Sequence, residues 1–178
     1  MRFVLNLNPT EEFARQIVDL QIKFFEYDSD DINDLTEIYY SIPEGYVVAY
    51  DGEEIIGCVN LLKRQITFEN TTILLGGLGG VCVKQESRNK GIAKEMLTMA
   101  MEQLKKWNCD MAYLCTESAS KLYEFFGFVN LNREKKTIGK SGKEYVSSDA
   151  MIASVCSKEK FDLVLHSHSI FDIQGGDW

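Results

Sequence analysis

The sequence predicts one α/β domain built on a mixed β-sheet, and three observations favour this fold class. Strand-like segments alternate with amphipathic helical segments along most of the chain. Asp51-Gly52, between two strand-like segments, is a strong β-hairpin signal. At 178 residues the chain is long enough for one full-sized core and short for two. We therefore expect a single domain over residues 1–178, with a core over 1–155 and a strand-rich C-terminal extension over 156–178.

In the first half of the chain the patterns predict a strand, two helices and a hairpin. Residues 2–6 form the strand, and Thr10 can cap a helix whose apolar face carries Phe13, Ile17, Leu20 and Phe24. A second, shorter helix is indicated by Ile32, Leu35 and Ile38. Residues 46–50 and 54–64 are the two strands of the hairpin.

The second half begins with a long strand over residues 72–83, which contains four glycines between Gly76 and Gly80. Glycines weaken an ordinary strand, so the backbone is expected to bend there or to let a ligand come close. A helix over residues 91–108 follows, with an inward face of Ile92, Met96, Met99 or Ala100, Leu104 and Trp107. Further strands are predicted over residues 111–115, 133–138, 149–155 and 161–173, with a short helix over 118–126 and a turn at 139–142.

Composition and charge exclude several classes of protein. The formal net charge is −8, whereas binding to nucleic acid requires a basic surface, so no nucleic-acid partner is expected. The sequence has no apolar run of about 18 residues, so no membrane span is expected either. Residues 1–6 are too short and too soon polar for a signal peptide, which makes the cytoplasm the expected location.

Cysteine and histidine do not form a recognisable metal motif. The five cysteines are an odd number without a C-x-x-C pair, and we interpret them as buried thiols in a reducing compartment. A nucleophilic cysteine is the alternative, although no histidine lies near any of them in the sequence. His166 and His168 would alternate on one strand face but lack a third zinc ligand, so no metal is expected.

A strongly acidic stretch runs from Glu26 to Glu37, with six acids and no base. One interpretation is a solvated loop and helix start. The other is an acidic lip that attracts a cationic substrate.

The residues Arg88-Asn89-Lys90-Gly91-Ile92-Ala93 lie where the glycine-rich strand gives way to an amphipathic helix. A helix N-terminus offers unpaired N–H groups and a positive dipole end, which bind phosphate well. Gly91 lets the backbone approach an anion, and Arg88 and Lys90 add positive charge in an otherwise acidic chain. The segment therefore predicts a site for an anionic ligand. A dinucleotide-binding fold is a weak rival, because no G-x-G-x-x-G follows an early strand.

The spacing R-x-x-G-x-A after a Val-x-Val strand resembles the pyrophosphate motif of the GNAT acetyltransferases. Leu122-Tyr123-Glu124-Phe125-Phe126-Gly127-Phe128 looks like a second conserved segment of that family, at the expected distance downstream. The resemblance covers roughly residues 1–155 and implies a splayed mixed β-sheet, flanked by helices, that binds acetyl-CoA. It assigns cofactor binding to Val81, Cys82, Val83, Arg88, Asn89, Lys90, Gly91, Ile92 and Ala93.

The same resemblance implies a catalytic tyrosine. Tyr123 matches the position of a tyrosine that protonates the departing CoA thiolate in the family. A phenol with a pKa near its ordinary value of about 10 can serve as that acid at neutral pH. The alternative for Tyr123 is a core tyrosine without a catalytic role.

The ending Gly175-Gly176-Asp177-Trp178 is similar to that of the aminoglycoside 2′-N-acetyltransferases. In those enzymes acidic residues and the C-terminal carboxylate surround a polycationic sugar. By position, the corresponding substrate-binding residues are Asp31, Asp34, Asp149, Asp177 and Trp178. The relatives also carry a glutamate two residues before the Val-x-Val strand, where this chain has Gly79. Glu117, beside the splayed strand end, and the Trp178 carboxylate are the expected replacements as general base.

These features together predict an N-acetyltransferase that moves an acetyl group from acetyl-CoA to a small polycationic amine such as an aminoglycoside. Direct transfer explains the absence of a catalytic triad, because no covalent acyl-enzyme is needed. A peptide or protein amine is the second candidate substrate, and a non-catalytic acetyl-CoA-binding module is the third hypothesis. A strand-like tail could also pair with a second copy of the chain in a homodimer, or cover an exposed sheet edge.

Overall fold

The computed structural model describes the backbone of residues 1–178 and every side chain except those of Ser29 and Asp34. A seven-stranded mixed sheet has the order β1-β2-β3-β4-β5-β9-β6, and a small second sheet has the order β10-β7-β8. The elements are β1 (Arg2–Asn6), α1 (Glu11–Phe25), α2 (Ser29–Ile38), β2 (Gly45–Asp51), β3 (Glu54–Phe68), β4 (Thr71–Val83), a 3-10 turn (Gln85–Ser87), α3 (Ile92–Lys106), β5 (Met111–Cys115), α4 (Ser120–Glu124), β6 (Val129–Asn130), β7 (Lys135–Ile138), β8 (Glu144–Ser147), β9 (Ala150–Ser154), α5 (Lys158–His166) and β10 (Phe171–Asp172). Among the described residues, no helix is long and apolar enough to cross a membrane.

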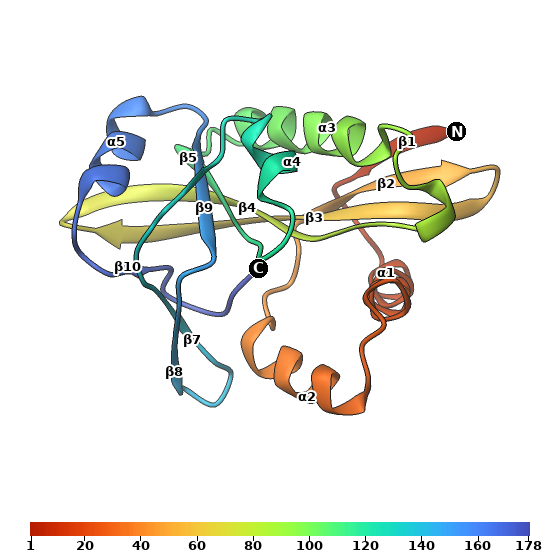
Figure 1. Cartoon of the computed structure of the whole chain (residues 1–178), viewed down its shortest axis with the longest axis horizontal. Helices are drawn as coiled ribbons and strands as arrows, with labels where there is room; N and C mark the ends of the chain where they lie inside the picture. The colour runs from red at the N-terminus through yellow and green to blue at the C-terminus, as the bar shows by residue number, and fades with distance from the viewer.

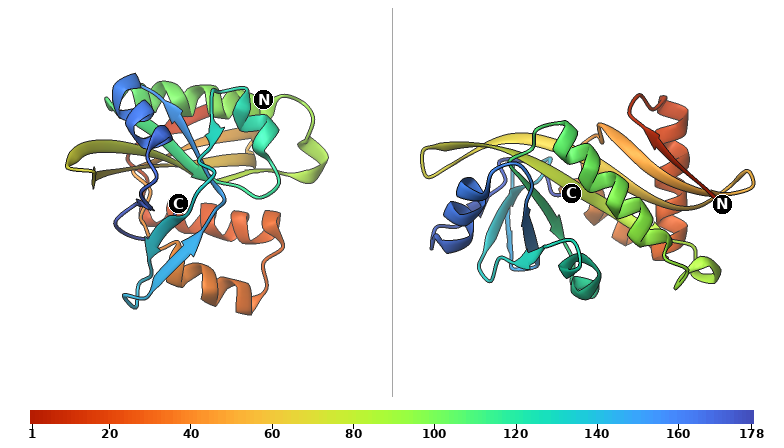
Figure 2. Two further views of the ribbon diagram at one scale, coloured as in Figure 1. Left: turned by 60° about the vertical axis from the view of Figure 1, so that its left-hand side comes forward. Right: turned by 90° about the horizontal axis from the view of Figure 1, so that it is seen from above.

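Helices cover both faces of the large sheet. α1 and α2 lie on one face, while α3 runs across the opposite face (Figures 1 and 2). α3 buries Ile92, Met96, Ala100 and Leu104 as the pattern predicts, with Ala100 rather than Met99 at the inner position. α1 starts as expected, since the Phe13 amide donates to Thr10 Oγ1 at 3.1 Å, and it packs Ile17 against the sheet. The prediction of a mixed sheet flanked by helices is confirmed.

The central strands β4 and β5 form a fork. They pair in parallel only from Leu75 opposite Met111 to Gly77 opposite Tyr113. Beyond Gly77, β4 continues to Val83 with β3 as its strand neighbour. The β3–β4 register shifts between Cys58 and Asn60, close to Gly80, whose φ of +53° suits glycine. The bend expected from the glycine-rich stretch is therefore present.

The same glycines admit another part of the chain. A Cβ placed on Gly77 would lie 2.0 Å from the Trp178 ring, and one on Gly79 would lie 3.0 Å from the Trp178 backbone. The C-terminal residues thus pack directly over the fork, near the centre of the molecule (Figure 1).

The prediction of a strand over residues 161–173 is wrong. Residues 158–166 form helix α5, capped by Ser157 Oγ, and only Phe171 and Asp172 are extended as β10. Phe161 and Val164 are buried and lie about one helical turn apart. The prediction of a strand assumed instead that every second residue is buried. His166 accordingly ends a helix, with its Nδ1 2.8 Å from the Asp162 carbonyl oxygen, and does not share a strand face with His168.

The turn at residues 139–142 was predicted to lie between strands at 133–138 and 149–155, but the strand that follows it in the structure is a different one. The turn joins β7 to β8, whereas β9 lies in the large sheet between β5 and β6. β8 is mostly exposed, so its residues lack the alternation of buried and exposed positions that signals a strand.

Arg64 fastens the tail to the large sheet. Its guanidinium donates to the carbonyl oxygens of Ile173 and Gly176 at 3.0 and 2.9 Å, and to Ser41 Oγ at 2.7 Å. The same group lies 4.8 Å from the centre of the Trp178 ring. Three hydrogen bonds and a stacking contact therefore converge on one side chain.

Replacing Arg64 by methionine should lower the free energy of unfolding by on the order of 3 kcal/mol, because partly buried carbonyls lose a charged donor. Urea unfolding measures this change. Arg15→Met is the matched control, since Arg15 is exposed and its one ion pair with the described side chains is to Glu11 on the same helix. Equal losses in the two variants would contradict the role of Arg64.

Candidate functional site

A cleft of about 560 Å³ opens between the helices α1 and α2 and the fork of the sheet. Its lining brings together residues that are far apart in the sequence. Six predicted site residues line it: Val81, Glu117, Tyr123, Asp149, Asp177 and Trp178. The cleft is therefore the candidate active site.

Tyr123 lies on the short helix α4 and is only 6% exposed, with its ring edge-on to Phe128. Its hydroxyl makes no hydrogen bond to the described residues. Burial, and to a lesser extent the Cys82 thiol, raises the pKa of Tyr123 to about 12. The phenol therefore keeps its proton at neutral pH and can donate it to a group in the cleft.

The loop before α3 has an unusual backbone. Asn89 and Gly91 both have positive φ, at 62° and 79°, and Gly91 caps α3 without a side-chain hydrogen bond. Among the described residues, no hydrogen bond is found for the backbone N–H groups of Asn89 and Gly91, and those of the first helical turn are free by geometry. A Cβ on Gly91 would meet nothing within 4 Å. Such an open nest of amides at a helix start suits a phosphate.

The basic side chains of this loop are exposed, and Arg88 is held against the end of β4. Its Nε donates to the Val83 carbonyl oxygen at 3.0 Å. The remaining N–H groups of the guanidinium and the Lys90 ammonium form no ion pair with the described residues. Ile92 and Cys82, in contrast, are buried in the core, so they can contribute only their backbone groups.

The free edge of β4 leads from this loop to the cleft. From Leu78 onward the side of β4 that faces β5 has no strand partner, because pairing ends at Gly77. An unpaired strand edge presents N–H and C=O groups to a ligand. The loop and the edge together offer a row of backbone hydrogen-bonding groups that leads from a candidate anion site to the cleft.

Beneath the inner end of the cleft lies a buried ion pair that the sequence analysis missed. The Lys135 ammonium donates to Asp177 Oδ2, lies 3.4 Å from Asp149 Oδ1 and contacts Cys115 Sγ at 2.6 Å. The Tyr113 hydroxyl donates to Asp177 Oδ1 at 2.6 Å. Burial alone would lower the pKa of Lys135, but Cys115 and Asp177 raise it overall, so the lysine stays charged. Asp177 is therefore already paired inside the protein.

Asp149 and Glu117 are the two other described carboxylate side chains that line the cleft, and Asp149 already forms an ion pair with Lys135. Burial would raise the pKa of Asp149, but a hydrogen bond from Ser147 and the nearby Lys135 lower it overall, so Asp149 is anionic at neutral pH. Glu117 is exposed and forms no hydrogen bond or ion pair with the described residues. The Thr116 amide donates to the Asp149 carbonyl oxygen at 3.1 Å, which brings the two acidic segments side by side.

Tyr39 is a further cleft residue without a sequence signal. Its ring is 42% exposed, yet burial of its hydroxyl and the nearby Asp177 raise the pKa of this phenol. Tyr39 therefore presents a neutral hydroxyl above the buried acid and lysine.

The structure describes only part of the acidic stretch at residues 26–37 that was predicted to attract a cationic substrate. Asp31 does not line the cleft; its carboxylate accepts the Asp28 amide and completes a capping box at the start of α2. The side chain of Asp34 lies outside the described residues. The roles of Asp31 and Asp34 in substrate binding stay predictions.

The cysteines agree largely with the sequence interpretation. Cys58, Cys82 and Cys109 are buried, Cys115 is partly buried and Cys156 is exposed. All five are free thiols, and burial raises the pKa of Cys115. The described residues contain no group of three metal-ligating side chains.

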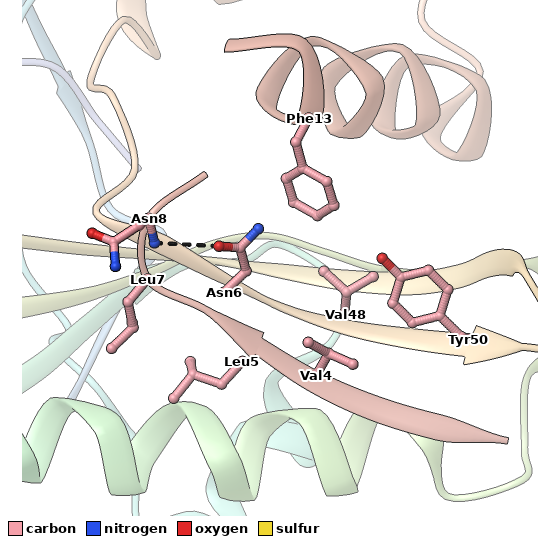
Figure 3. A pocket seen from close by; sticks show the side chains of 8 residues that line it. All are labelled: Val4, Leu5, Asn6, Leu7, Asn8, Phe13, Val48 and Tyr50. Carbon is pink, nitrogen blue, oxygen red and sulfur yellow. Dashed lines mark hydrogen bonds between the residues drawn. The ribbon is translucent and has the colours of Figure 1, made fainter. Parts of the chain in front are cut away.

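A second hollow of about 430 Å³ lies at the far edge of the sheet, between β1, β2 and Phe13 (Figure 3). Its lining holds no carboxylate, amine, thiol or imidazole and none of the predicted site residues. Chemistry is therefore expected in the cleft at the fork.

Comparisons with known proteins agree with this geometry. The family model described as the acetyltransferase (GNAT) domain matches residues 8–130, which is more than half of the chain. No curated protein matches the sequence.

Several solved structures share the fold. Escherichia coli ElaA is 12% identical with a TM-score of 0.59, and the match covers 86% of this chain and 99% of ElaA. A GNAT acetyltransferase from Staphylococcus aureus is 19% identical with a TM-score of 0.54, covering 86% and 99%. Eis1 from Mycobacterium abscessus is 13% identical with a TM-score of 0.58, and the match covers 76% of this chain.

The match extends over only 32–40% of Eis1 and of two further GNAT-like structures. At these identities the likeness to solved structures concerns the fold, whereas the family match rests on the sequence. The chain therefore belongs to the GNAT family of acetyl-CoA-dependent acetyltransferases.

Proposed function

We propose that the protein acetylates a primary amine of a small cationic molecule in the cleft at the fork. One observation carries this proposal: Tyr123, Glu117 and Asp149 line the same cleft as the free edge of β4. The NatC complex bound to Gag peptide and CoA has a chain with a TM-score of 0.54 and 20% identity to this one. That structure supports a CoA thioester as the acyl donor on this fold.

Each proposed role follows from the position of its residue. Acetyl-CoA supplies the acetyl group as an activated thioester. The amides of residues 89–93, with Arg88 and Lys90, would hold its diphosphate, and the edge of Val81–Val83 would lie along the pantetheine arm. Tyr123 keeps a proton at its hydroxyl for the leaving thiolate, and Glu117 accepts the proton of the substrate ammonium. Asp149 holds the ammonium in place.

The amine itself is the open part of the proposal. The aminoglycoside predicted from the tail needs several free carboxylates. Of the described carboxylate side chains in the cleft, Glu117 has no ion pair, whereas Asp149 shares Lys135 with Asp177. A peptide amine is the second candidate, because the NatC structure binds a peptide on the same fold. The exposed acids Asp30 and Asp31, on the helix that borders the cleft, favour a cation in either case.

Gly91→Ala should weaken CoA binding at least tenfold, because a side chain at a φ of +79° reshapes the amide nest. Isothermal titration with CoA measures the dissociation constant. Gly52→Ala is the matched control: Gly52 also has a positive φ and open space around it, but it lies in the β2–β3 turn. Equal CoA affinity in both variants would remove the loop from the cofactor site.

Tyr123→Phe should lower kcat by about 100-fold or more while leaving the CoA dissociation constant unchanged, since only proton donation is lost. Thiol release from acetyl-CoA reports the rate. An unchanged rate would show that Tyr123 is only a core residue.

The pH profile offers an independent check on Tyr123. Because its pKa is raised to about 12, the protonated form persists well above neutral pH, and kcat should not fall up to pH ~10, the pKa of an ordinary tyrosine. The profile is recorded at saturating substrates. A decline near pH 9 that disappears in Tyr123→Phe would be inconsistent with a buried acid of this kind.

A further inference from the structure

Among the described residues, the cleft wall formed by α1, α2 and the segments that follow each of them is mostly apolar or aromatic. It consists of Val18, Ile22, Phe25, Tyr27, Ile32, Leu35 and Tyr39. Of its polar members, Gln21 is already bonded to Asn60 and to the Gly80 carbonyl oxygen, and the Thr36 hydroxyl donates to the Asn33 carbonyl oxygen. Apart from the hydroxyls of Tyr27 and Tyr39, the described side chains of the wall therefore offer few hydrogen-bond partners to a polar ligand.

The charged side chains among the described residues that line the cleft lie at its other end. Glu117 and Asp149 lie on adjoining segments at the ends of β5 and β9, next to Tyr123. Lys135, whose side chain is only 2% exposed, pairs with both Asp177 and Asp149, so one cation faces two of these three acids. No lysine or arginine lines the cleft in the described part of the chain. The site thus has one anionic end and one apolar side.

Three apolar or aromatic residues of the wall are more exposed to solvent than is favourable for such side chains. Val18, Phe25 and Tyr39 are 50%, 40% and 42% exposed, and all three line the cleft. Grouped apolar exposure of this kind commonly marks a binding surface, because a ligand that covers it removes apolar area from water.

From this separation we infer that the acetyl acceptor is an amphipathic primary amine, with one ammonium group on an aromatic or branched alkyl body. This inference rests on the proposed acetyl transfer and narrows its substrate. The ammonium pairs with Glu117 and Asp149, and the apolar body lies against α1 and α2. An aminoglycoside fits less well, because its many hydroxyl and ammonium groups would lose water against a wall whose described side chains replace few of those hydrogen bonds.

A panel of amines tests the inference through thiol release from acetyl-CoA. 2-Phenylethylamine and ethylamine carry the same reacting group with and without a ring, while kanamycin and spermidine are polycationic. Burial of the ring should raise kcat/KM for 2-phenylethylamine over ethylamine by about 10- to 150-fold. A higher kcat/KM for kanamycin or spermidine, or no gain from the ring, would overturn the substrate class while leaving acetyl transfer intact.

The proposed function fails in a different way. If CoA binds in calorimetry but none of the four amines is acetylated, the acetyl transfer proposed for this cleft is wrong, and the substrate class with it.

A substitution in the helical wall tests whether the ring of 2-phenylethylamine binds there. Phe25→Ser should reduce the ratio of kcat/KM between 2-phenylethylamine and ethylamine about tenfold. Ile170→Ser is the control, because Ile170 is similarly exposed at 50% but lies outside the cleft, and it should leave that ratio unchanged. The CoA dissociation constant of each variant verifies that the fold is intact. An unchanged ratio in Phe25→Ser would contradict the assigned wall.

Discussion

The separation of β4 from β5 after Gly77 and Tyr113 is the constraint on which the site depends. Two parallel strands that part leave main-chain groups without partners, and such groups are costly unless something else binds them. The C-terminal residues occupy the start of this fork. Trp178 packs on Gly77, and Asp177 bonds both Lys135 and the Tyr113 hydroxyl. The tail is thus part of the architecture that keeps the fork in shape.

The fork also sets the order of charges along the site. At the end of β4, the open loop at residues 88–93 presents amides and two cations to an anion. At the end of β5, Glu117 and Asp149 present carboxylates to a cation. Tyr123 lines the same cleft, with its proton retained by burial. In the proposed reaction, an anionic thioester donor and a cationic amine would approach the cleft from these two ends.

Local signals predicted much of this arrangement, and long-range contacts account for what they missed. Thr10, Asp51-Gly52 and Gly91 act through the backbone of their own segments, so their patterns identified the α1 cap, the hairpin and the start of α3. Lys135 reads as an ordinary strand lysine, because its partners Cys115, Asp149 and Asp177 are distant in sequence. The tail was misjudged because alternating and helical apolar patterns overlap in a short segment, and the Ser157 cap decides for the helix.

The central claim is that acetyl-CoA binds along the loop and the free edge of β4, and the amide resonances of the protein test it most directly. Titration of ¹⁵N-labelled protein with CoA should shift the amides of residues 89–93 and of Val81–Val83 more than those elsewhere. The amides around the hollow between β1 and β2 serve as the internal reference. Shifts centred on that hollow, or no shifts at millimolar CoA, would contradict the account.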